Sequence, residues 1–278
     1  MIKIFCLTSG RTGTKYLSYL FKNNVKDCIG RHEPAPSMFG RSIYWYQKNQ
    51  KDKIEKLFKK KKEKINSLNA NAYVETNHAF LKSFSDVAIE HFPDMKLIHS
   101  IRNPLKVAKS NFNKYAQLRL IHYPLNYKGD DGNSYIKWTL TGNEEIYKSF
   151  NFDNKTIYQI IDEDKIYQYF LLEWIETENR AIEFLNKYKK HNECYTLDAP
   201  KDLNNENKIK KMFSFFGLEL KQEDISFRGR KNKGGKRTII TEKEKNLLKE
   251  IISKLPDKYL QIFKNKPYVD FEWGKIFN

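Results

Sequence analysis

The stretch IKIFCLTSGRTGTKY, residues 2–16, decides the fold of this chain. The mostly apolar run Ile2–Leu7 predicts a buried strand, and the amphipathic run Tyr16–Phe21 predicts a helix. The turn between them holds two glycines. In such a strand–turn–helix, backbone N–H groups and the positive end of the helix dipole point at one anion. The sequence therefore predicts a phosphate-like ligand at residues 8–15.

The residues of this turn supply what an anion needs. The two glycines permit close backbone approach, and the neighbouring side chains add hydroxyl donors and positive charge. Only Arg11 and Thr12 separate Gly10 from Gly13. The turn is therefore not a Walker A loop, which has a longer gap before its Gly-Lys pair. The candidate ligands are Ser9, Gly10, Arg11, Thr12, Gly13, Thr14 and Lys15.

A second strand–helix joint carries a related pattern. Lys96–Ile101 predicts a buried strand that leads into Arg102-Asn103-Pro104, and proline suits the first turn of a helix. On that helix, Ser110 is expected to face back toward the strand end. An arginine fork beside a hydroxyl makes a clamp for a terminal phosphate. Arg102 and Ser110 are therefore candidate ligands for a second phosphate.

The two motifs together resemble those of the sulfotransferases that use 3′-phosphoadenosine 5′-phosphosulfate (PAPS). The turn at 8–15 is similar to the family's 5′-phosphosulfate loop, and Arg102 with Ser110 to its 3′-phosphate site. Tyr195–Leu220 and the basic loop Phe227–Arg237 resemble later segments of the family. The resemblance implies PAPS as sulfuryl donor and no metal. It adds donor ligands in the basic loop, namely Arg230, Lys231 and Gly234, with Lys233 and Gly235 beside them.

The resemblance also implies catalytic roles. Arg11 stands where the family has its loop lysine or arginine, which stabilises the leaving phosphate. Two candidates for the base stay open. Glu33, in the segment RHEP, resembles the base of tyrosylprotein and some bacterial carbohydrate sulfotransferases. His78 resembles the histidine of the Lys-Thr-His segment of the cytosolic enzymes, although that lysine is absent and Asn77 intervenes. We favour Glu33. Lys15 departs from the usual threonine and points either to the sulfuryl group or to solvent.

Alternating strands and helices predict an α/β fold. We expect a single sulfotransferase domain over residues 1–278, with a parallel β-sheet flanked by helices in a P-loop-NTPase-like architecture. Both phosphate motifs then lie at the carboxyl ends of strands, where such sheets bind ligands.

Tyr123–Gly142 is expected to be a long loop, and segments 40–71 and 115–159 match no known pattern. The expected strands are Ile2–Leu7, Ala72–Thr76, Lys96–Ile101, Thr156–Ile160 and Cys194–Leu197. The expected helices are Thr14–Asn23, Asp52–Ser67, Phe84–His91, Leu105–Leu118, Asp164–Lys190, Glu206–Phe216 and Glu242–Leu255.

The composition of the chain limits which classes of protein and ligand are compatible with it. The chain has 278 residues, 40% of them hydrophobic, and a net charge of +17. This charge suits a polyanionic nucleotide donor, but we ascribe most of it to compositional bias and to solvated helix faces such as Lys59–Lys62. No run is long enough to span a membrane. Three cysteines make no disulfide framework, so a cytoplasmic protein is expected.

Two other classes of function compete with a sulfotransferase. A P-loop kinase of a nucleotide or small molecule would need the Walker spacing, which is absent. A basic nucleic-acid-binding protein would suit the charge, but the sequence contains no known binding motif. The acceptor, a hydroxyl or amine on a carbohydrate, peptide or small molecule, cannot be read from the sequence.

Overall fold

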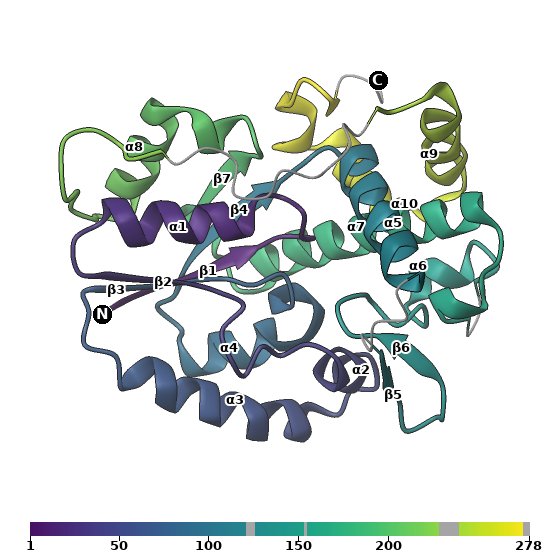
Figure 1. Cartoon of the computed structure of the whole chain (residues 1–278), viewed down its shortest axis with the longest axis horizontal. Helices are drawn as coiled ribbons and strands as arrows, with labels where there is room; N and C mark the ends of the chain where they lie inside the picture. The colour runs from purple at the N-terminus through teal and green to yellow at the C-terminus, as the bar shows by residue number, and fades with distance from the viewer. Residues whose placement is uncertain (121–125, 153–154, 228–238, 275–278) are drawn as a thin grey trace.

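The computed structural model describes the chain except for residues 121–125, 153–154, 228–238 and 275–278. A parallel five-stranded sheet lies at its centre, with strand order β2-β3-β1-β4-β7. Helices cover both faces of this sheet, as Figure 1 shows. The predicted α/β domain with a parallel sheet is therefore confirmed. The strands are β1 (Ile2–Leu7), β2 (Cys28–His32), β3 (Ala72–Thr76), β4 (Lys96–Ile101) and β7 (Cys194–Asp198).

The central strand β1 sends alternate side chains to the two faces, because successive residues of a strand point in opposite directions. Ile4 and Cys6 pack in the apolar cluster of one face. Phe5 and Leu7 pack in the cluster of the other. The first face is covered by α1 (Thr14–Asn24) and α8 (Glu206–Phe215), and the second by α3 (Lys51–Asn66) and α4 (Ser85–His91).

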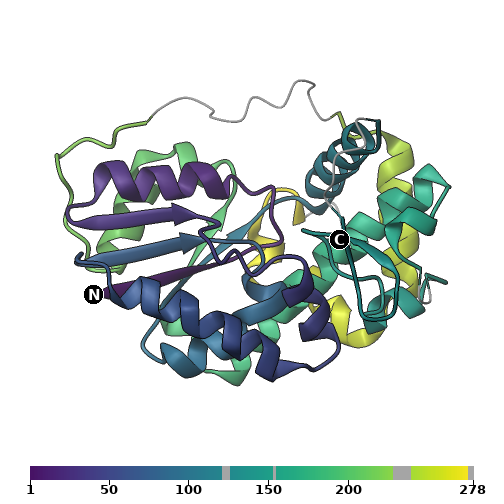
Figure 2. The same ribbon diagram turned by 60° about the horizontal axis from the view of Figure 1, so that its bottom comes forward.

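A third apolar cluster joins helices that extend past one end of the sheet, which we call the helical lobe (Figure 2). Its long helices α5 and α7 pack along each other. The lobe consists of α5 (Pro104–Leu120), the hairpin β5 (Asn126–Lys128) and β6 (Ser134–Ile136), α6 (Glu145–Lys148), α7 (Glu163–Lys187), α9 (Glu242–Lys254) and α10 (Asp257–Lys264). Between sheet and lobe lie α2 (Arg41–Gln47) and one π-helical turn, η1 (Phe80–Phe84). In the described part of the chain, no helix is long and apolar enough to cross a membrane.

Three sequence predictions are wrong. The expected strand Thr156–Ile160 is a 3₁₀ turn, Ile157–Gln159, because the side chains of Thr156 and Gln159 cap it. The expected loop at 123–142 contains the β5–β6 hairpin from Asn126 onward. The lysine run Lys59–Lys62 is not wholly solvated, because Lys61 is buried and paired with Glu75 of β3.

The prediction also missed β2, α2, α6 and α10. Strand β2 is an edge strand whose residues are mostly half-buried, so it lacks the apolar run of the inner strands. Helices α2 and α6 are short, and short elements carry too few turns for a clear period.

Candidate functional site

The glycine loop at residues 8–15 lies between β1 and α1. Gly10 and Gly13 have φ values of +90° and +86°, which side chains rarely adopt. A Cβ added to Gly13 would lie only 2.8 Å from Leu203 Cδ1, so the position also lacks room. The Thr8 and Thr12 hydroxyls lie 2.8 Å apart, and Thr8 Oγ1 accepts a hydrogen bond from the Gly10 N–H. The loop is thus held by its own hydroxyls.

The start of α1 offers hydrogen-bond donors to a ligand. Gly13 is its N-cap and supplies no side chain to the first turn. The hydroxyl of Ser9 is buried and has no hydrogen-bond partner among the described residues. A buried hydroxyl without a partner is costly, so this geometry suits an oxyanion at the loop. Thr14 is buried, and Lys15 is exposed on the first turn.

The second motif meets the loop directly, because β1 and β4 are neighbours in the sheet. Arg11 Nε donates a hydrogen bond to Ser110 Oγ at 2.8 Å. Arg102 Nη1 donates to the backbone carbonyl of Arg11 at 2.5 Å. The structure therefore brings Arg102 and Ser110, which the sequence assigns to a second phosphate site, into contact with Arg11 of the loop.

The two candidate bases contact each other. Glu33 follows β2 and His78 follows β3, and these strands are neighbours in the sheet. Glu33 Oε1 lies 2.7 Å from His78 Nδ1. A Cβ added to Gly10 would lie 3.2 Å from His78 Cγ and 3.3 Å from Cδ2, so this edge of the ring packs against the loop. From the sequence, Glu33 and His78 are alternative candidates for the base. In the structure they form a hydrogen-bonded pair beside the glycine loop.

The protonation states of this pair follow from its surroundings. Burial lowers the pKa of His78, and the charge of Lys82 lowers it further, against the opposing effect of Glu33. Burial would raise the pKa of Glu33, but the hydrogen bond and charge of His78, with His32 and Lys114, lower it overall. At neutral pH, Glu33 is therefore a carboxylate and His78 is neutral. The Nδ1–H of His78 then donates to Glu33, and the lone pair is on Nε2.

A buried ion pair supports the segment that carries Glu33. Lys61 Nζ lies 2.8 Å from Glu75 Oε1, and both side chains are almost fully buried. Tyr73 also donates to Glu75, which satisfies the carboxylate. Lys61 donates a further hydrogen bond to the carbonyl of Pro34. The buried lysine thus ties α3 and β3 to the chain next to Glu33.

Side chains of the helical lobe complete the site, and the sequence prediction missed them. Lys114 lies one helical turn beyond Ser110 on α5, a spacing that places both residues on one face. Its Nζ lies 4.4 Å from the ring centroid of Trp138. The carbonyl of Trp138 accepts a hydrogen bond from Lys82 on η1. The signal for Lys114 is therefore its spacing from Ser110, whereas no local signal marks Trp138.

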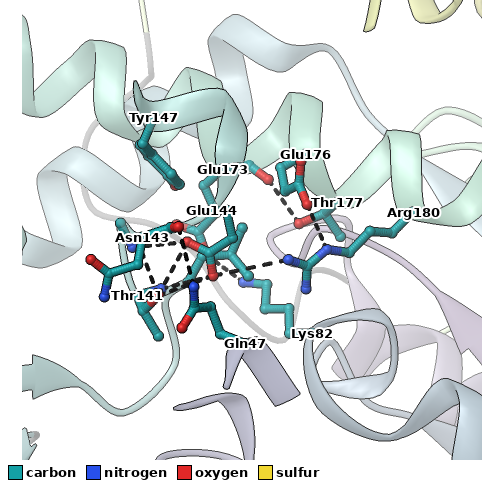
Figure 3. A network of polar contacts seen from close by, with 12 residues as sticks. Gln47, Lys82, Thr141, Asn143, Glu144, Tyr147, Glu173, Glu176, Thr177 and Arg180 are labelled. Carbon is teal, nitrogen blue, oxygen red and sulfur yellow. Dashed lines mark hydrogen bonds and ion pairs between the residues drawn. The ribbon is translucent and has the colours of Figure 1, made fainter. Parts of the chain in front are cut away.

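Lys82 belongs to a buried polar network that joins η1 to the lobe (Figure 3). It forms an ion pair with Glu173 of α7, and both side chains are 1% exposed. Beside this pair, Arg180 Nε donates to Glu176 at 2.8 Å and also contacts Glu144. The carboxylate of Glu144 accepts from backbone N–H groups at residues 141 and 142. The network fixes the segment that carries Trp138 against α7.

The remaining donor candidates, Arg230, Lys231 and Gly234, with Lys233 and Gly235, lie outside the described residues. Within the described residues, no group of three or more His, Cys, Asp and Glu side chains could hold a metal ion.

Comparison with known proteins supports the fold. No protein-family model and no curated protein matches the sequence. Among solved structures, a sulfotransferase from Alicyclobacillus acidocaldarius is similar over 96% of this chain and 97% of its own, with a TM-score of 0.52 and 13% identity. The chain therefore has a fold that is also found in a sulfotransferase.

Proposed function

We propose that this protein is a sulfotransferase that moves a sulfuryl group from PAPS to a hydroxyl or amine. The observation that carries the proposal is the junction of the glycine loop with Arg102 and Ser110, opposite the Glu33–His78 pair. The candidate anion site and the candidate proton acceptor lie at the carboxyl ends of neighbouring strands, and transfer of a sulfuryl group to a hydroxyl or amine needs both. The fold shared with a sulfotransferase supports the same class.

In this reaction the bond between sulfur and the bridging phosphate oxygen breaks as a bond forms between sulfur and the acceptor oxygen or nitrogen. The released phosphate oxygen takes the electron pair, and the acceptor's proton passes to the base. Arg11, the Ser9 hydroxyl and the N–H groups at the start of α1 stabilise the charge on the departing phosphate. Arg102, with Ser110, is assigned to the 3′-phosphate, because a guanidinium fork can donate to two phosphate oxygens at once.

The proton acceptor is assigned to the Glu33–His78 pair. Because Nδ1–H of the neutral histidine donates to Glu33, the Nε2 lone pair is the base and Glu33 orients the ring. Nε2 is bonded to Cδ2, a ring atom that packs against Gly10 of the glycine loop. This assignment gives Glu33, the base that the sequence favours, a positioning role.

Isothermal titration tests the donor assignment. Adenosine 3′,5′-bisphosphate is expected to bind the full chain without magnesium, and PAPS hydrolysis or transfer should be detectable with it as product. Binding of ATP only with magnesium would favour a kinase instead. Salt-sensitive binding of an oligonucleotide, without bisphosphate binding, would favour a nucleic-acid-binding protein.

A further inference from the structure

Lys114 has a position that the donor assignment does not use. It lies four residues beyond Ser110 on α5, a shift of about 6 Å along the helix axis. The half-buried side chain extends over the ring of Trp138. Lys114 therefore lies one helical turn farther from the end of β4 than Ser110 and contacts Trp138.

The charges around Lys114 leave it without an anion. Burial lowers its pKa, and Arg11 and Lys82 lower it further, while Glu33 and Glu173 act in the opposite direction. Glu33 is hydrogen-bonded to His78, and Glu173 is paired with Lys82. No carboxylate of the described residues forms an ion pair with Lys114. An ammonium held in this way favours an incoming negative charge.

Trp138 supplies a second unused donor. Its side chain is 7% exposed, and its indole N–H has no hydrogen-bond partner among the residues that the structure describes. The ring stacks on Phe170 with centroids 6.1 Å apart and an interplanar angle of 6°. The Lys82 ammonium donates a hydrogen bond to the backbone carbonyl of Trp138. The indole is thus fixed in place. Because buried N–H groups are nearly always hydrogen-bonded, this one favours a ligand that brings a hydrogen-bond acceptor.

We propose that Lys114 and Trp138 form an acceptor subsite for a carboxylate or sulfate carried beside the reacting hydroxyl. One oxygen of the anion accepts from the Lys114 ammonium and another from the Trp138 indole N–H. Glu33, which orients the proposed base His78, is among the charges that act on Lys114, so the subsite lies within electrostatic reach of the base. The inference rests on the proposed function, and it names the acceptor as an acidic hydroxyl compound.

The test compares two acceptor probes that differ in one carboxylate. Protein saturated with adenosine 3′,5′-bisphosphate is titrated with 4-nitrophenyl β-D-glucuronide and with 4-nitrophenyl β-D-glucoside. The glucuronide is expected to bind about tenfold more tightly or better, as a charged hydrogen bond allows. Lys114→Gln should remove this preference, and Trp138→Phe, which keeps the stacked ring, should reduce it about threefold or more.

Lys106→Gln is the matched control, because Lys106 is exposed on the same helix. It should keep the full preference. Equal binding of the two glycosides, or binding of neither, overturns the acidic subsite. Weaker bisphosphate binding by Lys114→Gln overturns it as well, because Lys114 is then a donor ligand. If the unaltered protein fails to bind the bisphosphate, the proposed sulfotransferase function itself is wrong.

Discussion

The glycine loop and the helical lobe reach the same site by different means. The loop is held by short-range contacts, such as the Thr8–Thr12 hydrogen bond, and by the neighbouring end of β4. The lobe is held by buried ion pairs between segments far apart in the chain, such as Lys82 with Glu173. The glycine loop thus depends on local backbone geometry, whereas the helical lobe depends on tertiary packing. Substitutions should therefore separate binding, catalysis and stability.

The largest effect is expected for the base. His78→Asn should lower turnover by about 10²–10⁴-fold, the usual contribution of a general base. Bisphosphate affinity should stay near that of the unaltered protein, because the ring only borders the glycine loop. Steady-state kinetics and titration calorimetry measure the two quantities. His32→Asn is the control, since His32 lies 3.6 Å from the same Glu33 oxygen. Normal turnover by His78→Asn together with an inactive Glu33→Gln would assign the base to Glu33.

The next effect concerns the lobe. Lys82→Met should lower the free energy of unfolding by about 3–5 kcal/mol, because it leaves Glu173 buried without its partner. Urea unfolding measures the loss. Lys51→Met is the control, and it should cost less than about 1 kcal/mol because its pair with Glu90 is exposed. Adding Glu173→Leu to Lys82→Met should restore stability. A small loss for Lys82→Met would mean that the buried pair does not hold the lobe.

A third prediction concerns Arg102 and the proposed 3′-phosphate site. Arg102→Ala should weaken bisphosphate binding by about 2–4 kcal/mol, because a bound phosphate loses a charged hydrogen-bonding partner. Stability should change less than in Lys82→Met. Lys106→Ala, on the exposed face of α5, serves as the control. Unchanged affinity in folded Arg102→Ala would remove Arg102 from the 3′-phosphate site.

The smallest effect concerns pH. Because burial lowers the pKa of His78 to about 4, the ring stays neutral as pH falls through its ordinary value near 6.5. Between pH 7.5 and pH 6, kcat/KM should therefore change by less than about twofold. An ordinary imidazole base would lose about fourfold over this range. Since the pKa of Glu33 is also lowered, this profile tests the surroundings of the pair and does not choose between its members.

The prediction succeeded where the signal is contiguous. Residues 2–16 predict β1, the glycine turn and α1. The motif that contains Arg102 and Ser110 predicts β4 and α5. It failed at Thr156–Ile160, where a capping box outweighs an apolar pattern. It also failed at Lys61, because helical spacing alone does not reveal that Glu75 lies buried opposite it. Trp138 was not predicted for a similar reason. The residues that fix it, Lys82 of η1 and Phe170 of α7, lie far from it in the sequence.

The parallel sheet, the glycine loop and the position of both motifs at the carboxyl ends of strands follow from the sequence alone. These features depend on residue period, on glycine's freedom at positive φ and on the rule that parallel strands end at one edge. The pairing of Glu33 with His78, and the contact of Lys114 with Trp138, follow from the three-dimensional packing and not from any local pattern. The reason is that β2 and β3 are neighbours although a long segment separates them, and that lobe contacts join distant parts of the chain.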